Sequence, residues 1–364
     1  MVATVVVVGG GYGGIAVAKE LDDIADVVLV EARETFVHNV AALRGAVSPE
    51  WIERMFIPYD GLLANGRVVR GRAVRVSAGA VELESGEKLS ADYLVLATGS
   101  GQPYPAKIEV EGRADASARL RATGGEIERA GRVLLLGAGP VGLEFAGEIK
   151  ARWPEKSVVI VDPSPDLLSG RFPAEFRAEL RAQLDALGVE LHLGTALTAP
   201  PPAGGGPVTV TTDAGVTITA DLWFACHGRT PRTGYLDDDL GTARRPDLHL
   251  SVTPELRLPG QDTVFAIGDI NDVPEMKVAR LAEAQAEVAA ANIRALIEGR
   301  PAGLRAYEPG ADAILLPLGT TAGVSYHPEA GVLGPEATQG MKGEFFLDRY
   351  LEKLGVKAAE TSTA

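Results

Sequence analysis

The sequence predicts an α/β fold built from two units of the same kind, in which buried parallel strands alternate with helices. Two observations support this prediction. A strand, a glycine-rich turn and a helix follow one another from Val5 to Leu21, and the same order returns from Arg132 to Trp153. A chain of 364 residues is also long enough for two or three domains, each with its own core.

The first unit opens with four valines, Val5–Val8, which suit a parallel strand buried on both faces. The next residues fit the pattern G-x-G-x-x-G: Gly9 allows a tight turn, Gly11 lets backbone N–H groups approach a pyrophosphate, and Gly14 permits close helix–strand contact. Glu31 ends the second strand about 20 residues on, where an acid can accept hydrogen bonds from a ribose. A glycine-rich packing turn is the alternative interpretation.

The second unit repeats the pattern. Its strand leads into Gly137, Gly139 and Gly142, an amphipathic helix follows, and the next strand ends at Asp162. Two such fingerprints in one chain are much harder to obtain by chance than one. The sequence therefore predicts two bound dinucleotides.

Two further strands end in residues suited to a ligand. The strand 93–96 runs into the small-residue turn Ala97, Thr98 and Gly99, where a bulky side chain would keep the backbone away from a ligand. The strand within 262–270 ends at Gly268 and Asp269, and a carboxylate there can hydrogen-bond a sugar alcohol in the crevice at the strand ends. Asp269 also suits a helix N-cap, and both roles are compatible.

Composition excludes several classes of protein. Lys and Arg number 35 against 49 Asp and Glu, a net charge of −14, so we expect no nucleic-acid partner. The single cysteine, Cys226, excludes an intramolecular disulfide, a redox cysteine pair and a cysteine-held iron–sulfur cluster, and we interpret it as a buried strand residue. The five histidines lack ligand-like spacing, so no metal is expected.

No apolar run reaches membrane-spanning length, and the N-terminal run is interpreted as a strand rather than a signal peptide. We therefore expect a cytoplasmic protein, monomer or homodimer, whose only membrane contact would be peripheral, at the inner face. The high Ala, Gly and Arg content indicates a bacterial origin.

Taken together, these motifs resemble the two-dinucleotide flavoprotein reductases of the pyridine nucleotide-disulfide oxidoreductase family, which have a glutathione-reductase-like fold. The resemblance implies FAD on the first Rossmann-like unit and NAD(P)H on a second unit inserted into it. The expected domains are an FAD-binding domain at 1–110 and 243–305, an NAD(H)-binding domain at 111–242 and a C-terminal domain at 306–364.

Disulfide reductases of this family carry two cysteines after the second strand, where this chain reads FVHNVAALRGAV (36–47). This segment, with GLEFAGEIKARWPEKSV and GDINDVPEMKVARLAEAQAEVAAANI, resembles instead the branch that contains ferroptosis suppressor protein. The branch implies an NADH:quinone oxidoreductase, with hydride passing from NADH to flavin N5 and two electrons then passing to a quinone-like acceptor. Position 2 is Val2 rather than Gly, so the acyl anchor of the animal members is not expected.

Asp162 bears on the choice of nicotinamide. A carboxylate there accepts both ribose hydroxyls of NADH but repels the 2′-phosphate of NADPH, so we expect NADH to be preferred. Arg171, nine residues on, is the side chain that would weaken this preference by reaching back.

The resemblance assigns roles to three charged side chains. Glu144 matches an acidic position that approaches the nicotinamide amide, with an exposed helix carboxylate as the alternative. Lys277, in the first turns of a helix expected to begin near Val273, matches a lysine near the flavin, with a surface lysine as the alternative. Lys342 matches a lysine near the electron acceptor.

Phe345 and Phe346, beside Lys342, either line an apolar quinone channel or pack a terminal helix, and packing is the more ordinary role. His38, Asn39 and Arg44 occupy the segment that replaces the redox cysteines and should border the flavin. Arg44 would pair with the FAD pyrophosphate or, alternatively, form a salt bridge within the protein.

The expected cofactor contacts fall into two sets. For FAD they are Gly9, Gly11, Gly14, Glu31, Ala32, Arg33, Asn39, Val40, Arg44, Ala97, Thr98, Gly99, Gly268, Asp269 and Lys277. For NADH they are Gly137, Gly139, Val141, Gly142, Glu144, Asp162 and Gly228.

Three other functions remain as alternatives. A ferredoxin reductase needs a basic docking face for its acidic carrier, and the charge of −14 argues against one. A slow-turnover redox sensor like apoptosis-inducing factor would share every residue above. A reductase for one aromatic metabolite would do so as well.

Overall fold

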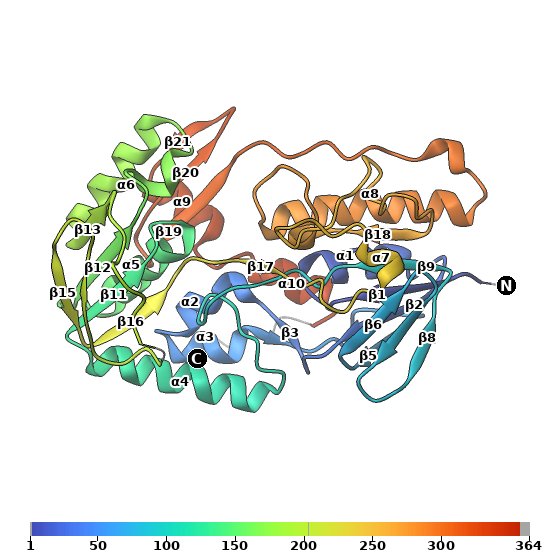
Figure 1. Ribbon diagram of the computed structural model, residues 1–364, viewed down its shortest axis with the longest axis horizontal. Coiled ribbons are helices and arrows are strands. Elements are labelled where there is room, and N and C mark those ends of the chain that lie inside the picture. Colours follow the sequence, from blue (N-terminus) through green and yellow to red (C-terminus); the bar gives the residue numbers. More distant parts are fainter. Residues whose placement is uncertain (1, 203, 357–364) are drawn as a thin grey trace, which may run out of the picture.

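The computed structural model describes residues 2–202 and 204–356 (Figure 1). Position 1 of the expected FAD domain, position 203 of the expected NAD(H) domain and positions 357–364 of the expected C-terminal domain lie outside the described residues.

The first sheet is parallel and has the strand order β18-β9-β1-β2-β5. Its strands are β1 (Thr4–Val8), β2 (Asp26–Glu31), β5 (Arg67–Arg70), β9 (Tyr93–Leu96) and β18 (Val264–Ala266). The edge strand β18 comes from more than 160 residues after β9, so a late segment of the chain returns to complete this sheet.

Both faces of the first sheet are covered, which explains its unbroken valine run. Val5 and Val7 pack with helices α1 (Tyr12–Leu21) and α8 (Ala279–Ile297), whereas Val6 and Val8 pack toward a small antiparallel sheet. That sheet consists of β6 (Ala73–Ser77), β7 (Ala80–Leu83) and β8 (Lys88–Ser90). Since neither face of β1 meets water, alternation of polar and apolar residues is not required in that strand.

The second sheet is also parallel, in the order β13-β12-β11-β16. Its strands are β11 (Arg132–Leu136), β12 (Ser157–Asp162), β13 (Val189–Leu193) and β16 (Leu222–Ala225), and its helices are α4 (Arg113–Arg129), α5 (Pro140–Arg152) and α6 (Ala174–Ala186). The hairpin β14 (Val208–Thr211) and β15 (Thr217–Ala220) covers its other face. The chain passes from the first unit to the second and later returns. The two connecting segments pair with each other through the short antiparallel strands β10 (Ser100–Gly101) and β17 (Thr230–Pro231).

The C-terminal segment contacts both units. The antiparallel strands β19 (Ile314–Leu318), β20 (Ala322–His327) and β21 (Gly331–Leu333) and helix α9 (Pro335–Lys342) lie beside α5 and α6 in Figure 1. A Cβ on Gly147 of α5 would lie 2.4 Å from Leu318 Cα, so only glycine permits this close packing. Helix α10 (Leu347–Lys353) then returns to the first unit and packs with α1.

Short elements complete the chain: β3 (Phe36–Val37), η1 (Asn39–Ala41), α2 (Ala42–Gly45), α3 (Pro49–Arg54), β4 (Phe56–Ile57), η2 (Leu167–Gly170), α7 (Asp238–Gly241), η3 (Gly268–Ile270) and η4 (Pro301–Gly303). The helix expected near Val273 begins only at Ala279, so that prediction is wrong by six residues. Pro274 lies in the intervening loop, and proline disfavours helical geometry in the residue before it. Among the described residues, no helix combines the length and apolar content needed to cross a bilayer.

Candidate functional site

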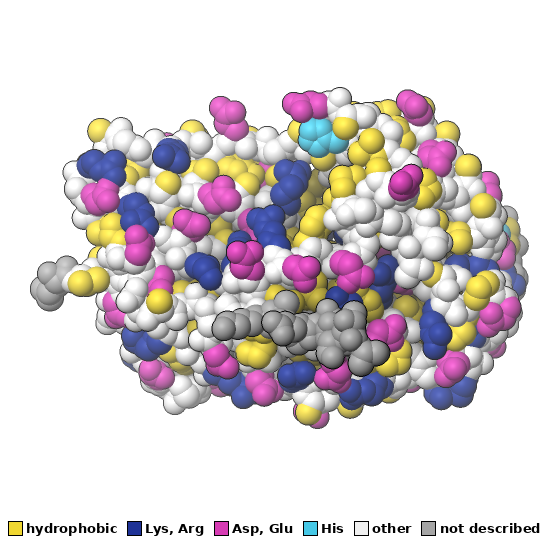
Figure 2. Space-filling model, turned by 180° about the vertical axis from the view of Figure 1, so that it is seen from behind, with side chains coloured by type: hydrophobic (Ala, Val, Ile, Leu, Met, Phe, Trp, Pro, Cys, Tyr) yellow, Lys and Arg dark blue, Asp and Glu magenta, His cyan; other side chains and the backbone are white. Residues whose placement is uncertain are grey.

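One cleft of about 1240 Å³ runs along the carboxyl ends of both parallel sheets and reaches the C-terminal segment. In open α/β sheets this edge is where ligands bind. On the face shown in Figure 2, Lys and Arg side chains lie beside hydrophobic ones where the surface is hollowed between its two halves. The cleft is thus large enough, and placed correctly, for extended dinucleotides.

The cleft is basic although the chain is acidic. Among its described lining residues nine are Lys or Arg and five are Asp or Glu, an excess of four positive charges within a chain of −14. Such an excess attracts anionic ligands, as a pyrophosphate requires. The basic residues are Arg33, Lys107, Arg171, Arg229, Arg232, Lys277, Arg280, Lys342 and Arg349, and the acidic residues are Glu31, Glu144, Asp269, Glu275 and Glu283.

The two glycine turns have the same internal geometry. Gly9 and Gly137 have φ of 107° and 120°, in the region that favours glycine. A Cβ on Gly14 would lie 1.8 Å from Gly9 O, and one on Gly142 would lie 2.0 Å from Gly137 O. At these four positions the backbone geometry of the turns therefore requires glycine.

Gly11 and Gly139 have a different environment. A Cβ on either residue would meet no other heavy atom within 4 Å, and both glycines line the cleft at the start of a helix, α1 or α5. Open space beside a helix N-terminus is what an approaching pyrophosphate needs. The residues present therefore fit the two dinucleotides that the sequence predicts.

An acid supports each glycine turn. Gly10 N donates to Glu31 Oε2 at 2.7 Å, and Ala138 N donates to Asp162 Oδ2 at 2.6 Å. Glu31 also pairs with Arg33, at 3.0 Å, and lines the cleft; burial opposes ionisation, but the charge and hydrogen bonds of Arg33 lower the pKa of Glu31 overall. Asp162 does not line the cleft, and Arg171 lies 3.4 Å from Asp312 in an ion pair instead of reaching toward it.

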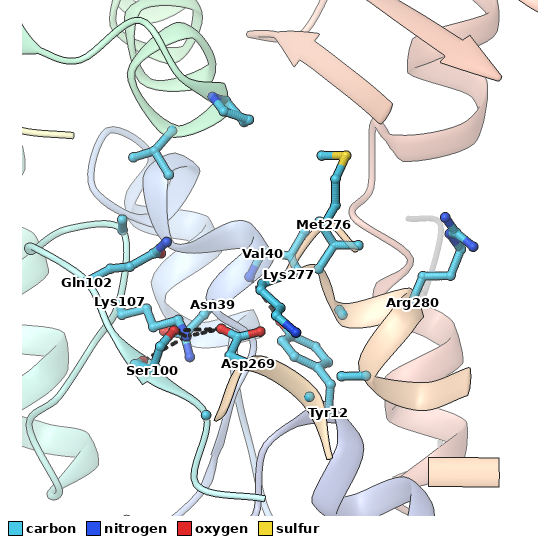
Figure 3. A pocket seen from close by; sticks show the side chains of 18 of the residues that line it. Tyr12, Asn39, Val40, Ser100, Gln102, Lys107, Asp269, Met276, Lys277 and Arg280 are labelled. Atoms are coloured by element: carbon cyan, nitrogen blue, oxygen red, sulfur yellow. Dashed lines mark hydrogen bonds and ion pairs between the residues drawn. The ribbon is translucent and has the colours of Figure 1, made fainter. Parts of the chain in front are cut away.

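Asp269 stands at the centre of a polar cluster (Figure 3). Its Oδ2 accepts hydrogen bonds from Ser100 Oγ at 2.6 Å and Lys107 Nζ at 3.1 Å. Burial raises the pKa of this carboxyl, but the charges of Lys107 and Arg229 together with the hydrogen bonds outweigh burial and lower it. The sequence analysis did not predict Lys107, which lies in an irregular loop and belongs to no motif. The one sequence feature that could have indicated its role is its closeness in the chain to the turn at Gly99.

Lys277 also faces this region, in the loop two residues ahead of α8 rather than within a helix. Its Nζ donates to Asn271 Oδ1 and to Val273 O, both at 3.0 Å. Burial lowers the pKa of this ammonium, although Glu275 and Asp269 oppose the effect. Because Lys277 precedes α8, the sequence argument that placed it inside the first helical turns does not hold.

Glu144 and Lys342, predicted separately, meet at one wall of the cleft. Lys342 Nζ donates to Glu144 Oε1 at 2.6 Å and to Leu315 O at 3.0 Å. Burial raises the pKa of Glu144, and Lys342 limits the rise. The alternative of an exposed helix carboxylate is therefore wrong for Glu144.

Arg44 does not line the cleft, so its predicted contact with the FAD pyrophosphate is corrected. Its Nε and Nη2 donate to the two carboxylate oxygens of Glu148, both at 2.9 Å, and its remaining hydrogen bonds go to Gly343 O and Gly319 O. Arg44 is thus the salt-bridged arginine of the alternative prediction, buried between α2, α5 and the C-terminal segment.

The neighbouring predictions divide between core and cleft. His38 is fully buried and does not line the cleft, with Nε2 bonded to Phe345 O at 2.9 Å and Nδ1 3.2 Å from Tyr12 Oη. Phe345 is buried against Trp51, whereas Phe346 is 41% exposed and lines the cleft. Both phenylalanines lie in the turn between α9 and α10, and Phe345 packs in the core cluster that includes α10, which is the packing alternative.

Most predicted site residues share the cleft. Those lining it are Gly9, Gly11, Glu31, Arg33, Asn39, Val40, Ala97, Thr98, Gly99, Gly268, Asp269, Lys277, Gly139, Val141, Glu144, Gly228 and Lys342. Those that do not are Gly14, Ala32, Arg44, Gly137, Gly142 and Asp162.

Cys226 corrects another prediction, because it follows β16 and lines the cleft instead of lying within the strand. Burial raises the pKa of its thiol to about 12, so it is a thiol and not a nucleophilic thiolate near neutral pH. Within residues 2–202 and 204–356, no group of three or more His, Cys, Asp or Glu side chains is placed to hold a metal ion.

Two supported glycine turns that open into one basic cleft define an FAD-dependent NAD(P)H oxidoreductase. Residues 3–291 match the family described as pyridine nucleotide-disulphide oxidoreductase, and the chain belongs to that family.

Similar proteins align with this sequence along most of its length. Apoptosis-inducing factor homolog B of Dictyostelium discoideum is 31% identical over 96% of each chain. Ferroptosis suppressor protein 1 of Homo sapiens is 33% identical over 88% of this chain and 87% of its own.

Solved structures share the fold. The sulfide:quinone oxidoreductase of Aquifex aeolicus superimposes with a TM-score of 0.77 at 19% identity, over 98% of this chain and 93% of its own. NDH2 of Plasmodium falciparum, solved in complex with NADH, gives a TM-score of 0.74 at 13% identity, over 97% of this chain and 96% of its own.

Proposed function

We propose that this protein is an NADH:quinone oxidoreductase that uses FAD. The observation that carries the proposal is the part of the cleft lined by the C-terminal segment, where the half-buried Glu144–Lys342 pair lies among apolar lining residues. The described apolar residues of this segment that line the cleft include Ile314, Leu315, Leu333, Met341 and Phe346, and Met276 from the loop ahead of α8 also lines it. An apolar lining with a few polar groups suits a flat aromatic acceptor.

The first glycine turn, with Glu31, the Ala97–Gly99 turn and Asp269, would hold FAD, and the second turn with Gly228 would hold NADH. FAD, when bound, takes a hydride from the nicotinamide and passes two electrons to the acceptor. The protein's own residues orient both cofactors along one cleft. Reduction of a quinone to a quinol also needs protons, and Lys342 Nζ holds a proton beside the apolar wall.

NADH is proposed over NADPH because of Asp162. Its carboxylate supports the turn at Ala138 and lies at the end of β12, where the additional phosphate of NADPH would bring a second negative charge. Arg171, the nearby cation, is paired with Asp312. The structural neighbours solved as a sulfide:quinone oxidoreductase and with NADH support the same assignment of substrates.

The test follows flavin absorbance in a rapid-mixing instrument, first with NADH or NADPH and then with a short-chain quinone or with air. We expect rapid bleaching by NADH, rapid recovery with quinone and slow recovery in air. A persistent long-wavelength charge-transfer band that quinone does not discharge would instead support a redox sensor and overturn the quinone assignment.

A pair of variants separates the two half-reactions. Met341→Ser with Phe346→Ser makes the apolar wall polar and should slow reoxidation by quinone about tenfold while leaving bleaching by NADH unchanged. Val74→Ser, at an exposed valine outside the cleft, is the matched control. Equal reoxidation rates in all three proteins would exclude this wall as the acceptor site.

A further inference from the structure

Helix α10 lies against the first glycine turn although it comes from the end of the chain. The ring of Tyr350 in α10 is 5.1 Å from that of Tyr12, the first residue of α1, and 4.9 Å from that of His38. Lys19 Nζ donates to Lys353 O, which fixes α10 along α1. Tyr12, Tyr350 and Arg349 all line the cleft.

A buried acid lies next to the same turn. Glu283 of α8 is 3% exposed and lines the cleft. The residue before it, Ala282, faces the turn so closely that a Cβ on Gly13 would lie 3.2 Å from Ala282 O. Glu283 thus follows a residue that contacts the N-terminal part of α1, and it lines the same cleft as Gly11 and Tyr12, where a pyrophosphate is expected.

Both cations that pair with Glu283 come from α10. Lys353 Nζ donates to Glu283 Oε1 at 2.8 Å. Arg349 Nη2 lies 2.9 Å from Glu283 Oε2 without the alignment of a hydrogen bond, so this second contact is one of charge. Without these two cations, the first dinucleotide site would contain a buried, uncompensated carboxylate.

We propose that α10 is part of the FAD site, where Arg349 and Lys353 neutralise Glu283 and so allow the anionic pyrophosphate to bind beside it. The proposal rests on the assignment of FAD to the first glycine turn. Like charges brought together in a buried site repel strongly, whereas a neutralised carboxylate no longer opposes the phosphate. The C-terminal segment thereby has a cofactor-binding task in addition to lining the acceptor wall.

The test measures the dissociation constant of FAD by diluting the holoprotein and following the fluorescence of released flavin. Arg349→Met with Lys353→Met should weaken FAD binding at least tenfold. Adding Glu283→Gln to that double variant should restore most of the affinity, because the repelling charge is gone. Glu283→Gln alone should bind FAD as tightly as the wild type or more tightly.

The matched control is Arg54→Met with Arg294→Met, which removes the same charge from surface pairs with Glu344 and Asp23, outside the cleft. It should keep wild-type affinity. Unchanged FAD affinity in the α10 double variant overturns the proposal, as does weaker binding that Glu283→Gln fails to restore.

If the α10 double variant does not fold, Glu283→Gln alone decides the question, since tenfold weaker binding in that variant contradicts charge neutralisation. FAD release requires neither NADH nor an acceptor. Failure of the quinone assignment would therefore leave this measurement unaffected.

Discussion

Glu144 and Lys342 form a half-buried ion pair, with 2.6 Å between Oε1 and Nζ, although 198 residues separate them in the chain. The pair joins helix α5 of the second unit to the end of α9 in the C-terminal segment. It also places the residue predicted to approach nicotinamide against the residue predicted to lie near the acceptor. The two expected functions therefore share one contact.

Glu144→Gln should slow flavin reduction by NADH about 10- to 100-fold, because a hydrogen bond to a charged group contributes about 1.5–3 kcal/mol. Rapid mixing without oxygen measures the rate. Glu179→Gln, at an exposed position of α6, is the control and should react like the wild type. A normal rate in Glu144→Gln would remove this carboxylate from the reaction.

Asp162→Asn should raise the efficiency with NADPH relative to NADH about tenfold, since the amide carries no charge to repel the 2′-phosphate; its oxygen keeps the acceptor for Ala138 N, while the acceptor for Ser164 N is lost. The ratio of kcat/KM for the two nucleotides measures the change. Asp213→Asn, on the same unit but outside the cleft, should leave the ratio unaltered. If Asp162→Asn also leaves it unaltered, Asp162 does not set the preference.

Arg44→Met should lower the free energy of unfolding by about 3–5 kcal/mol, because it leaves Glu148 charged and buried without a partner. Arg44→Met with Glu148→Met removes both charges and should recover most of that loss. Arg54→Met breaks an exposed pair and should cost about 1 kcal/mol or less. Urea unfolding compares them, and equal losses for Arg44→Met and Arg54→Met would contradict the buried-pair account.

His38 should make stability depend on pH. Burial lowers the pKa of His38 from its ordinary 6.5 to about 4, so the folded protein resists protonation that the unfolded chain accepts. This pKa difference contributes about 3 kcal/mol to the free energy of unfolding. The contribution is fully present above pH 6.5 and is lost as the pH falls toward 4. His38→Gln keeps a donor for Phe345 O, and its urea midpoint should fall less between pH 7 and pH 5 than that of the wild type. Parallel curves would exclude His38 as the source.

The glycine fingerprints were readable from sequence because they encode short-range geometry. Gly9 and Gly137 are required by their positive φ, and Gly14 and Gly142 by their closeness to Gly9 O and Gly137 O in the same strand–turn–helix unit. A valine run buried on both faces is equally local evidence for a parallel strand. The family resemblance then assigned the order of the two units.

Sequence patterns were less reliable where a side chain acts through distant partners. The choice between the two predicted roles of Arg44 depended on Glu148, Gly319 and Gly343, which approach it only after three segments have packed. Lys107 belongs to no motif, and its role follows from Asp269, 162 residues further on.

The sequence by itself therefore determined the two glycine turns, their supporting acids and the lack of a redox cysteine pair, because each depends on residue type at fixed spacing. Only the tertiary structure decided which charges meet: Glu144 with Lys342, Arg44 with Glu148, and Glu283 with the cations of α10. Ion pairs need a few ångströms of separation in space, and the packing of α5, α8 and the C-terminal helices sets that separation.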